Sequence, residues 1–111
     1  MPEQTADETR AELRHKVADE VCELVERKAH DYGDSFKLGC DTLGRILYEN
    51  SIRVFDKASR FRNLARNLDR DGADGRQVED EDIPQNLRDL AGYAIILLAE
   101  IEESGGTNAA P

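Results

Sequence analysis

The sequence predicts an all-α protein: a small bundle of three to four main helices, completed by oligomerisation. Three segments place apolar residues at intervals of three and four, the helical period, and no segment shows the alternation of a β-strand. The 111 residues, 39% apolar and 5% aromatic, suit a single domain, 1–111, with a modest core. We therefore expect a homodimer or higher homo-oligomer that buries further area.

The first helix is predicted from about residue 6 to 30. Thr5 and Glu8 have the spacing of a capping box, and Gly33 permits the left-handed turn that ends a helix. Its apolar stripe consists of Leu13, Val17, Val21, Leu24 and Val25.

The second helix is predicted to begin near Asp41 or Thr42, both good N-caps, and to run for about 27 residues. A helix of this length is either bent, broken near Asn50–Ser51, or part of a bundle. Its apolar stripe consists of Leu43, Ile46, Leu47, Val54, Ala58, Phe61, Leu64, Ala65 and Leu68.

The third helix is predicted to follow a mobile acidic loop at about 69–82 and to have Pro84 in its first turn. Apolar residues cover most of its sides, so we expect it to be buried on most sides, at the centre of the fold or of an oligomer interface. The ordered core is then about 6–103, and the tail 104–111 is expected to be disordered. The stripe consists of Ile83, Leu87, Leu90, Ala91, Ala94, Leu97, Leu98 and Ile101.

Charge and composition exclude several classes of function. The net charge of −9 argues against general nucleic-acid binding, which needs a basic surface. The N-terminal stretch is polar and acidic, and no apolar run reaches the length of a membrane span. We expect a cytoplasmic protein without membrane contact, in which Cys22 is a buried reduced thiol and Cys22 and Cys40 have no metal-type spacing.

Three cations share one face of the second helix, because Arg53, Lys57 and Arg60 follow an i, i+4, i+7 spacing. Such cations repel one another unless an anion lies opposite. Glu49 and Asp56 can offset them, which would make this a solvated surface. Alternatively, the cations neutralise the phosphates of a ligand.

A polar edge interrupts the apolar third helix at Asn86, Asp89 and Tyr93. A buried carboxylate needs a partner, since an unpaired buried charge is costly. The partner of Asp89 is either a cation of the second helix or a divalent metal ion.

The junction after the first helix is the third candidate feature. Lys28, Asp31 and Tyr32 precede Gly33, which is more than a helix end requires. They form either an ordinary C-cap or one wall of a pocket for a phosphorylated, base-bearing molecule. Upstream, Glu20 and Glu23 point the same way on a helix and can chelate Mg²⁺ through oxygen ligands.

Three of these motifs together resemble a known family. Lys28-x-x-Asp31-Tyr32-Gly33, then the Arg53-x-x-x-Lys57-x-x-Arg60 helix, then Asp89-Leu90-x-x-Tyr93-Ala94 are similar to the phage and bacterial nucleotide-modification-associated domain, the first of that name, over about residues 20–101. The resemblance implies a small all-helical protein linked to free or modified nucleotides, with no established reaction. The sequence departs from the family pattern at Gln85, where an acid is usual, which removes one potential metal ligand.

A more distant likeness is to the MazG-like all-α NTP pyrophosphatases. That likeness implies Mg²⁺ held by an ExxE pair, here Glu20 and Glu23, and by an ExxD pair. The second pair is incomplete, because Asn86 stands three residues before Asp89.

The resulting hypothesis is a protein that binds nucleotides. The activity considered for it is that of a Mg²⁺-dependent nucleotide pyrophosphatase. The alternatives are a non-catalytic protein that sequesters a nucleotide or nucleotide-derived signal, as in phage counter-defence, and a dimeric structural or adaptor module. Whether the chain is an enzyme is left open by the sequence. The predicted ligand-binding residues are Lys28, Asp31, Tyr32, Arg53, Lys57, Arg60, Asn86 and Tyr93, and the predicted metal ligands are Asp89, Glu20 and Glu23.

Overall fold

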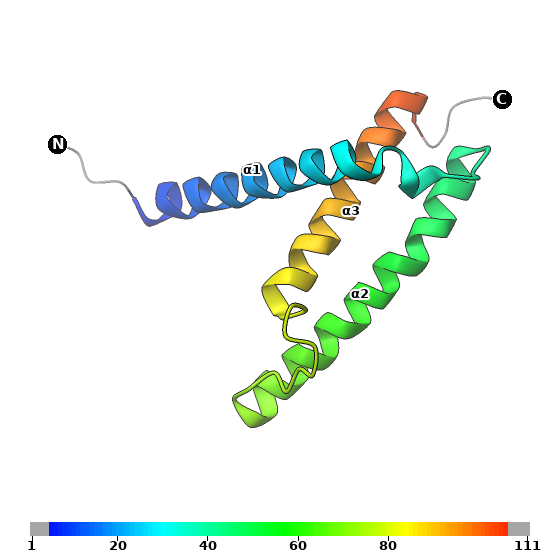
Figure 1. Cartoon of the computed structure of the whole chain (residues 1–111). Coiled ribbons are helices and arrows are strands. Elements are labelled where there is room, and N and C mark those ends of the chain that lie inside the picture. The colour runs from blue at the N-terminus through cyan, green and yellow to red at the C-terminus, as the bar shows by residue number, and fades with distance from the viewer. Residues whose placement is uncertain (1–4, 107–111) are drawn as a thin grey trace. The chain divides into compact units, whose positions relative to one another are not determined.

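The computed structural model describes residues 5–106 and confirms the all-α class (Figure 1). The elements are α1 (Ala6–Tyr32), the short 3₁₀ helix η1 (Ser35–Lys37), α2 (Leu43–Asp71) and α3 (Ile83–Ser104). No strand occurs within 5–106. The predicted disordered tail lies outside the described residues from 107 onward. The chain divides into two compact units at Gly33, and each is described by itself.

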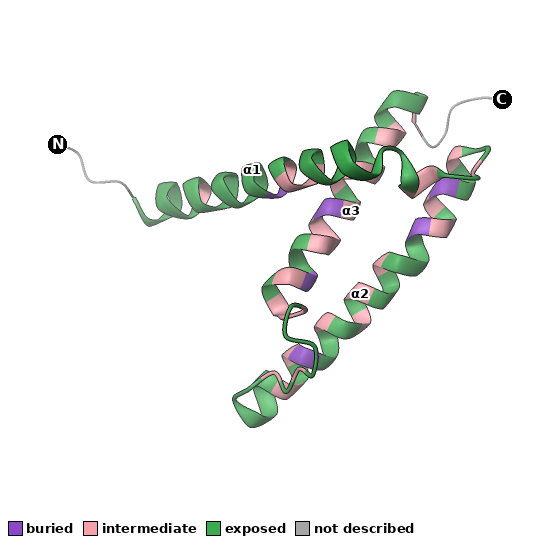
Figure 2. Cartoon of the chain, viewed as in Figure 1, coloured by how far each residue is buried: buried purple, intermediate pink, exposed green. Residues whose placement is uncertain are grey.

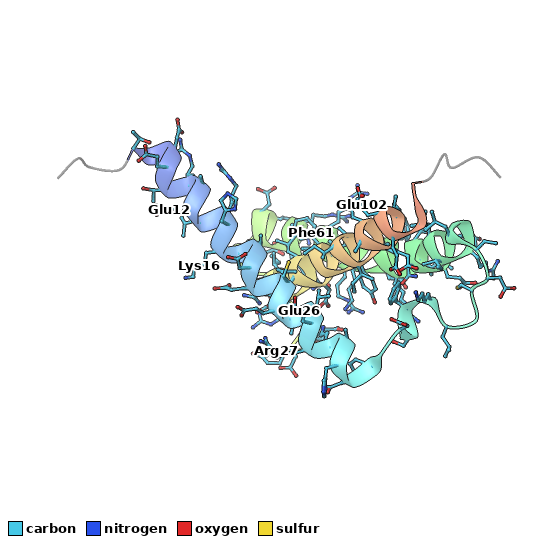
Figure 3. The ribbon with its side chains drawn as sticks, turned by 90° about the horizontal axis from the view of Figure 1, so that it is seen from above. Glu12, Lys16, Glu26, Arg27, Phe61 and Glu102 are labelled. Atoms are coloured by element: carbon cyan, nitrogen blue, oxygen red, sulfur yellow. The ribbon has the colours of Figure 1, made fainter. Side chains whose placement is uncertain are left out.

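The first unit is the helix α1, which begins as predicted. The Thr5 hydroxyl accepts a hydrogen bond from the Glu8 amide at 3.1 Å, and the Glu8 carboxylate accepts one from the Thr5 amide at 3.2 Å. This is a complete capping box. Glu12, Lys16, Glu26 and Arg27 project from the helix as exposed charged side chains (Figure 3).

The end of α1 lies two residues beyond the predicted one. Gly33 has a φ of +62°, which favours glycine, and its amide donates to the Ala29 carbonyl at 2.8 Å. Its ψ of −139° lies outside the left-handed helical region, so the predicted left-handed cap is only half correct.

The second unit is built around α2, whose 29 residues span about 43 Å. Thr42 is the N-cap, and its hydroxyl accepts from the Arg45 amide at 3.1 Å. The helix continues through Asn50 and Ser51 without a break and ends at Gly72, which has a φ of +75°. The predicted alternative of a broken second helix is therefore wrong.

The connection between α2 and α3, residues 72–82, is held by polar contacts. The Asn67 amide donates to the Asp74 carbonyl at 2.9 Å, and Arg76 pairs with the Asp74 carboxylate at 2.7 Å. The Arg76 backbone N–H and its guanidinium both stabilise the carboxylate and lower the pKa of Asp74. The loop starts three residues later than predicted, because α2 continues to Asp71.

α3 begins at the N-cap Asp82, whose carboxylate accepts from the Gln85 amide at 2.8 Å, and Pro84 lies in its first turn as predicted. α3 packs against α2. Ile46 and Leu64 on α2 and Asn86 and Gly92 on α3 are buried (Figure 2).

Within this unit the third helix is not buried on most sides, and its predicted burial in an oligomer interface stays a prediction. Leu87 is 44% exposed and Leu98 is 62% exposed. The reason is geometric: a single neighbouring helix covers only one face, and in this unit that neighbour is α2.

Candidate functional site

Two of the three predicted cations on α2 form ion pairs with residues at the start of α3. Lys57 Nζ lies 2.9 Å from Asp89 Oδ2 and 3.8 Å from Glu81 Oε1. Arg60 Nη1 lies 2.6 Å from the same Glu81 oxygen. We call Lys57, Arg60, Glu81 and Asp89 the ion-pair cluster.

The ion-pair cluster is half-buried and its charges compensate one another. The Lys57 and Asp89 side chains are 24% and 14% exposed, and Gln85 Nε2 donates to the second Asp89 oxygen at 2.9 Å. Of the two partners predicted for Asp89, the structure shows the cation. The predicted offset by Glu49 is not the one formed, because Glu49 pairs with Arg45 instead.

Asn86 lies beside this cluster, and its side chain forms hydrogen bonds with the backbone. It is 1% exposed, and its Nδ2 donates to the carbonyls of Glu81 and Asp82 at 3.0 and 2.8 Å. Its Oδ1 is buried without a hydrogen-bond partner. Since both amide hydrogens are used on backbone carbonyls, Asn86 fixes the chain where it enters α3. Tyr93, two turns further on, is half-buried.

A second buried asparagine occupies the corresponding place near the start of α2. Asn50 is 1% exposed, and its Nδ2 donates at 2.8 Å to the carbonyls of both Phe36 and Ile46. Its Oδ1 also has no partner. The bond to Phe36 attaches the η1 segment to α2, which it contacts.

A pocket of about 220 Å³ lies where η1 and its following turn meet α2. Glu49, Asn50 and Arg53 line it from α2. The Arg53 guanidinium makes no hydrogen bond or ion pair with any residue in 5–106. The remaining lining residues are Phe36, Leu38 and Cys40, the last a free thiol.

An ion pair, which we call the tether, attaches η1 to α3. Lys37 Nζ lies 3.2 Å from Glu100 Oε1 on α3. The hydrogen bond to Glu100, with attraction from the same carboxylate, raises the pKa of Lys37. One wall of the pocket is therefore attached to both helices of the unit.

Of the residues that line the pocket, Arg53 is the one among the predicted ligand-binding residues. A signal was present at Asn50, which lies four residues after Ile46 and four before Val54, in phase with the apolar stripe. A break near Asn50–Ser51 is one alternative that the sequence predicts for this long helix. In the structure Asn50 marks the helix position that bonds to η1.

The predicted site residues of the first unit lie near the end of α1. Asp31 and Tyr32 are exposed, and His30 Nδ1 lies 3.4 Å from Asp31 Oδ1. Glu20 and Glu23 are exposed on the same helix, as is Lys28. Because these residues belong to the first unit, their grouping with Arg53 stays a prediction.

Whether a metal ion fits the predicted ligands depends on how their carboxylates are grouped and paired. Within residues 5–106, no three His, Cys, Asp or Glu side chains come together as a metal-binding group. A metal ion at Asp89 would have to displace Lys57 and Gln85 from its oxygens. Asp89 as a metal ligand is thus not favoured by its contacts, whereas Glu20 and Glu23 offer two carboxylates on one helix.

The model of Nucleotide modification associated domain 1 matches residues 28–101, more than half of the chain. The chain belongs to this family. The matched region includes η1, α2, nearly all of α3, the ion-pair cluster and the pocket.

No curated protein matches the chain, and no solved structure does. Among the helices of the described part, none has the length and apolar character to cross a membrane.

Proposed function

We propose that this chain binds a nucleotide or a nucleotide-derived small molecule in the pocket between η1 and α2. The observation that carries the proposal is the state of Arg53. It shares a helix face with Lys57 and Arg60, but those two are neutralised by Glu81 and Asp89. Arg53 faces a pocket and has no protein anion as a partner among residues 5–106. Membership of a nucleotide-associated family supports the class of ligand.

Binding without catalysis is the form of this function that the contacts favour. The carboxylate of Asp89 is held by an ammonium and an amide, so its oxygens serve the interface between α2 and α3. The proposed role is sequestration of a nucleotide or nucleotide-derived signal in the cytoplasm.

The test is a thermal-shift panel of ribo- and deoxyribonucleotides, with and without Mg²⁺, on the wild type and on Arg53→Ala. A ligand at 100 times its Kd stabilises the protein by about 2.7 kcal/mol. The wild type should show this shift and Arg53→Ala should lose it. Arg62→Ala is the matched control, because Arg62 is an exposed arginine of the same helix outside the pocket. Equal shifts in both variants would place the ligand elsewhere.

Hydrolysis is the second candidate, and Glu20 and Glu23 support it as an exposed pair of oxygen ligands for Mg²⁺. It corresponds to the proposed likeness to MazG-like pyrophosphatases. Incubation with nucleoside triphosphates and Mg²⁺, followed by a pyrophosphate assay, tests it. Turnover that disappears in Glu20→Gln and Glu23→Gln, but not in Glu12→Gln, would establish an enzyme. No turnover with any nucleotide would end this candidate.

We also propose a homo-oligomer, and the exposed apolar side chains support it. On α2, Tyr48, Ile52 and Phe55 are 63%, 50% and 71% exposed and share one helix face, at i, i+4 and i+7. Sedimentation at tens of micromolar should show a dimer or larger species. An adaptor role follows only if the protein oligomerises and no nucleotide binds.

A further inference from the structure

One face of α3 is apolar in its middle and carries a charge at each end. Its residues follow one another at intervals of three and four, so they lie in one row along the helix: Arg88, Ala91, Ile95, Leu98 and Glu102. We call this row the α3 seam. Leu98 is 62% exposed, and the charged residues at both ends are exposed as well. Ala91 and Ile95 are half-buried, so the α2–α3 unit leaves much of the seam uncovered.

The charges at the ends of the seam are not used within the chain. Asp89 and Glu100 on α3 form ion pairs with lysines of the same unit. Arg88 and Glu102 form none with any residue in 5–106. Residues 90–99 between them carry no charged side chain. A partner that fits the seam must therefore be apolar in its middle, with an acid opposite Arg88 and a cation opposite Glu102.

A second copy of the seam meets this requirement when the two α3 helices run antiparallel. Arg88 precedes Ile95 by seven residues, and Glu102 follows it by seven. A two-fold axis at Ile95 therefore places Arg88 of each copy beside Glu102 of the other, in a closed, self-complementary interface. A parallel pair would instead place like charges beside each other, which repel.

The sizes of the side chains also suit an antiparallel pair. Leu98 follows Ile95 by three residues, and Ala91 precedes it by four. The large side chain of one copy then lies against the small one of the other, which allows the helix axes to approach within the 8–10 Å of packed helices. From Arg88 to Glu102 the seam extends over about 21 Å of helix.

We infer that the chain dimerises through the α3 seam, with antiparallel α3 helices and an ion pair between Arg88 and Glu102 at each end of the interface. This inference rests on the proposed homo-oligomer and specifies its interface, and it does not depend on nucleotide binding. Leu98, exposed in the single chain, becomes covered in the dimer. An interface at this helix is also what its many apolar sides predict.

Charge reversal on the full chain tests the pairing, with the dimer Kd measured by sedimentation equilibrium. Arg88→Glu and Glu102→Arg each place like charges together at both ends of the interface, so each should raise the dimer Kd about tenfold or more. The double variant restores opposite charges and should return the Kd to within about threefold of the wild type. In a parallel pair, like charges would face each other in every variant. An unchanged Kd in both single variants would therefore overturn the antiparallel pairing.

Glu103→Arg is the matched control, because it makes the same charge change one residue from Glu102 and off the seam. Its dimer Kd should stay within about threefold of the wild type. If Glu103→Arg weakened the dimer as much as Glu102→Arg, the effect would be one of net charge and the inference would be overturned.

Two further variants separate this interface from the exposed face of α2. Leu98→Glu places a charge in the middle of the seam and should give monomers at concentrations where the wild type is dimeric, whereas Phe55→Glu on α2 should leave the dimer intact. A dimer that survives Leu98→Glu and is lost in Phe55→Glu would overturn the inference but keep the homo-oligomer, with its interface on α2. A wild type that stays monomeric at tens of micromolar would overturn both.

Discussion

The two ends of the α2–α3 pair use the same helix face in opposite ways. Near the connecting loop, Lys57 and Arg60 meet Glu81 and Asp89, so each cation has a carboxylate within 3 Å. One turn earlier on α2, Arg53 forms no ion pair with any of the described residues and lines a pocket. The sequence spacing of the three cations is regular. The three cations differ in the groups that lie opposite them. Lys57 and Arg60 form ion pairs, which are structural contacts, whereas Arg53 lines a pocket, which is a candidate binding site.

The two buried asparagines sharpen this contrast. Asn50 and Asn86 are each 1% exposed, each donates to two backbone carbonyls, and each has an unpartnered Oδ1. Asn86 lies next to the compensated charges, whereas Asn50 lies in the pocket wall. The same arrangement of hydrogen bonds therefore occurs twice in the unit, once beside ion pairs and once beside a pocket.

The largest effect is expected for Asp89→Ala. Removal of the carboxylate leaves the half-buried Lys57 with Glu81, at 3.8 Å, as its one acidic partner among residues 5–106. It should destabilise the protein by about 2 kcal/mol in urea denaturation. Arg53→Ala should remain within about 0.5 kcal/mol of the wild type. A double-mutant cycle with Lys57→Ala measures the coupling. Equal destabilisation by Asp89→Ala and Arg53→Ala would remove the contrast between the two ends.

A smaller effect is expected for the asparagines. Asn50→Ala and Asn86→Ala each lose two side-chain hydrogen bonds to the backbone and remove one unpaired oxygen, for a net loss of about 1 kcal/mol in thermal unfolding. The two variants should be alike in stability. They should differ in ligand binding, which only Asn50→Ala is expected to weaken. If Asn86→Ala weakened nucleotide binding as much at matched stability, the pocket would not be the site.

The smallest effect is expected from the tether of η1 to α3. The raised pKa of Lys37 means that its bond to Glu100 stabilises the fold fully below the ordinary lysine pKa of 10.5. That contribution is lost as the pH rises through the higher folded pKa. The difference in urea midpoint between wild type and Lys37→Met should therefore be constant from pH 7 to 9 and shrink above pH 10.5. A difference that persists unchanged into stronger alkali would show that the ammonium is not responsible.

Much of the fold follows from the sequence because its signals are local. Thr5, Thr42 and Pro84 mark helix starts through contacts within one turn, and the structure has all three in those roles. The number of apolar sides of the third helix did not predict how much of it is covered within this unit. Burial depends on how many neighbours surround a helix, and periodicity along one helix carries no such information.

The site was less accessible to sequence reasoning. A buried Asp89 needs a partner, and Lys57 is one of the cations that the sequence offers for that role. The pair of Lys57 and Asp89 could therefore be predicted. The pocket depends on η1 and its turn reaching α2 through the Phe36 carbonyl. A backbone carbonyl has no sequence signature, so the contact that defines the pocket was invisible before the fold.

The connection at residues 72–82 has a consequence for the way the chain folds. Asn67 and Arg76 hold its backbone by short-range bonds, so the turn that brings α3 back onto α2 closes over a small separation in sequence. Closing a short segment costs little chain entropy, and contacts of low sequence separation form quickly. We expect this helical hairpin to be an early folding nucleus, onto which the η1 segment attaches later.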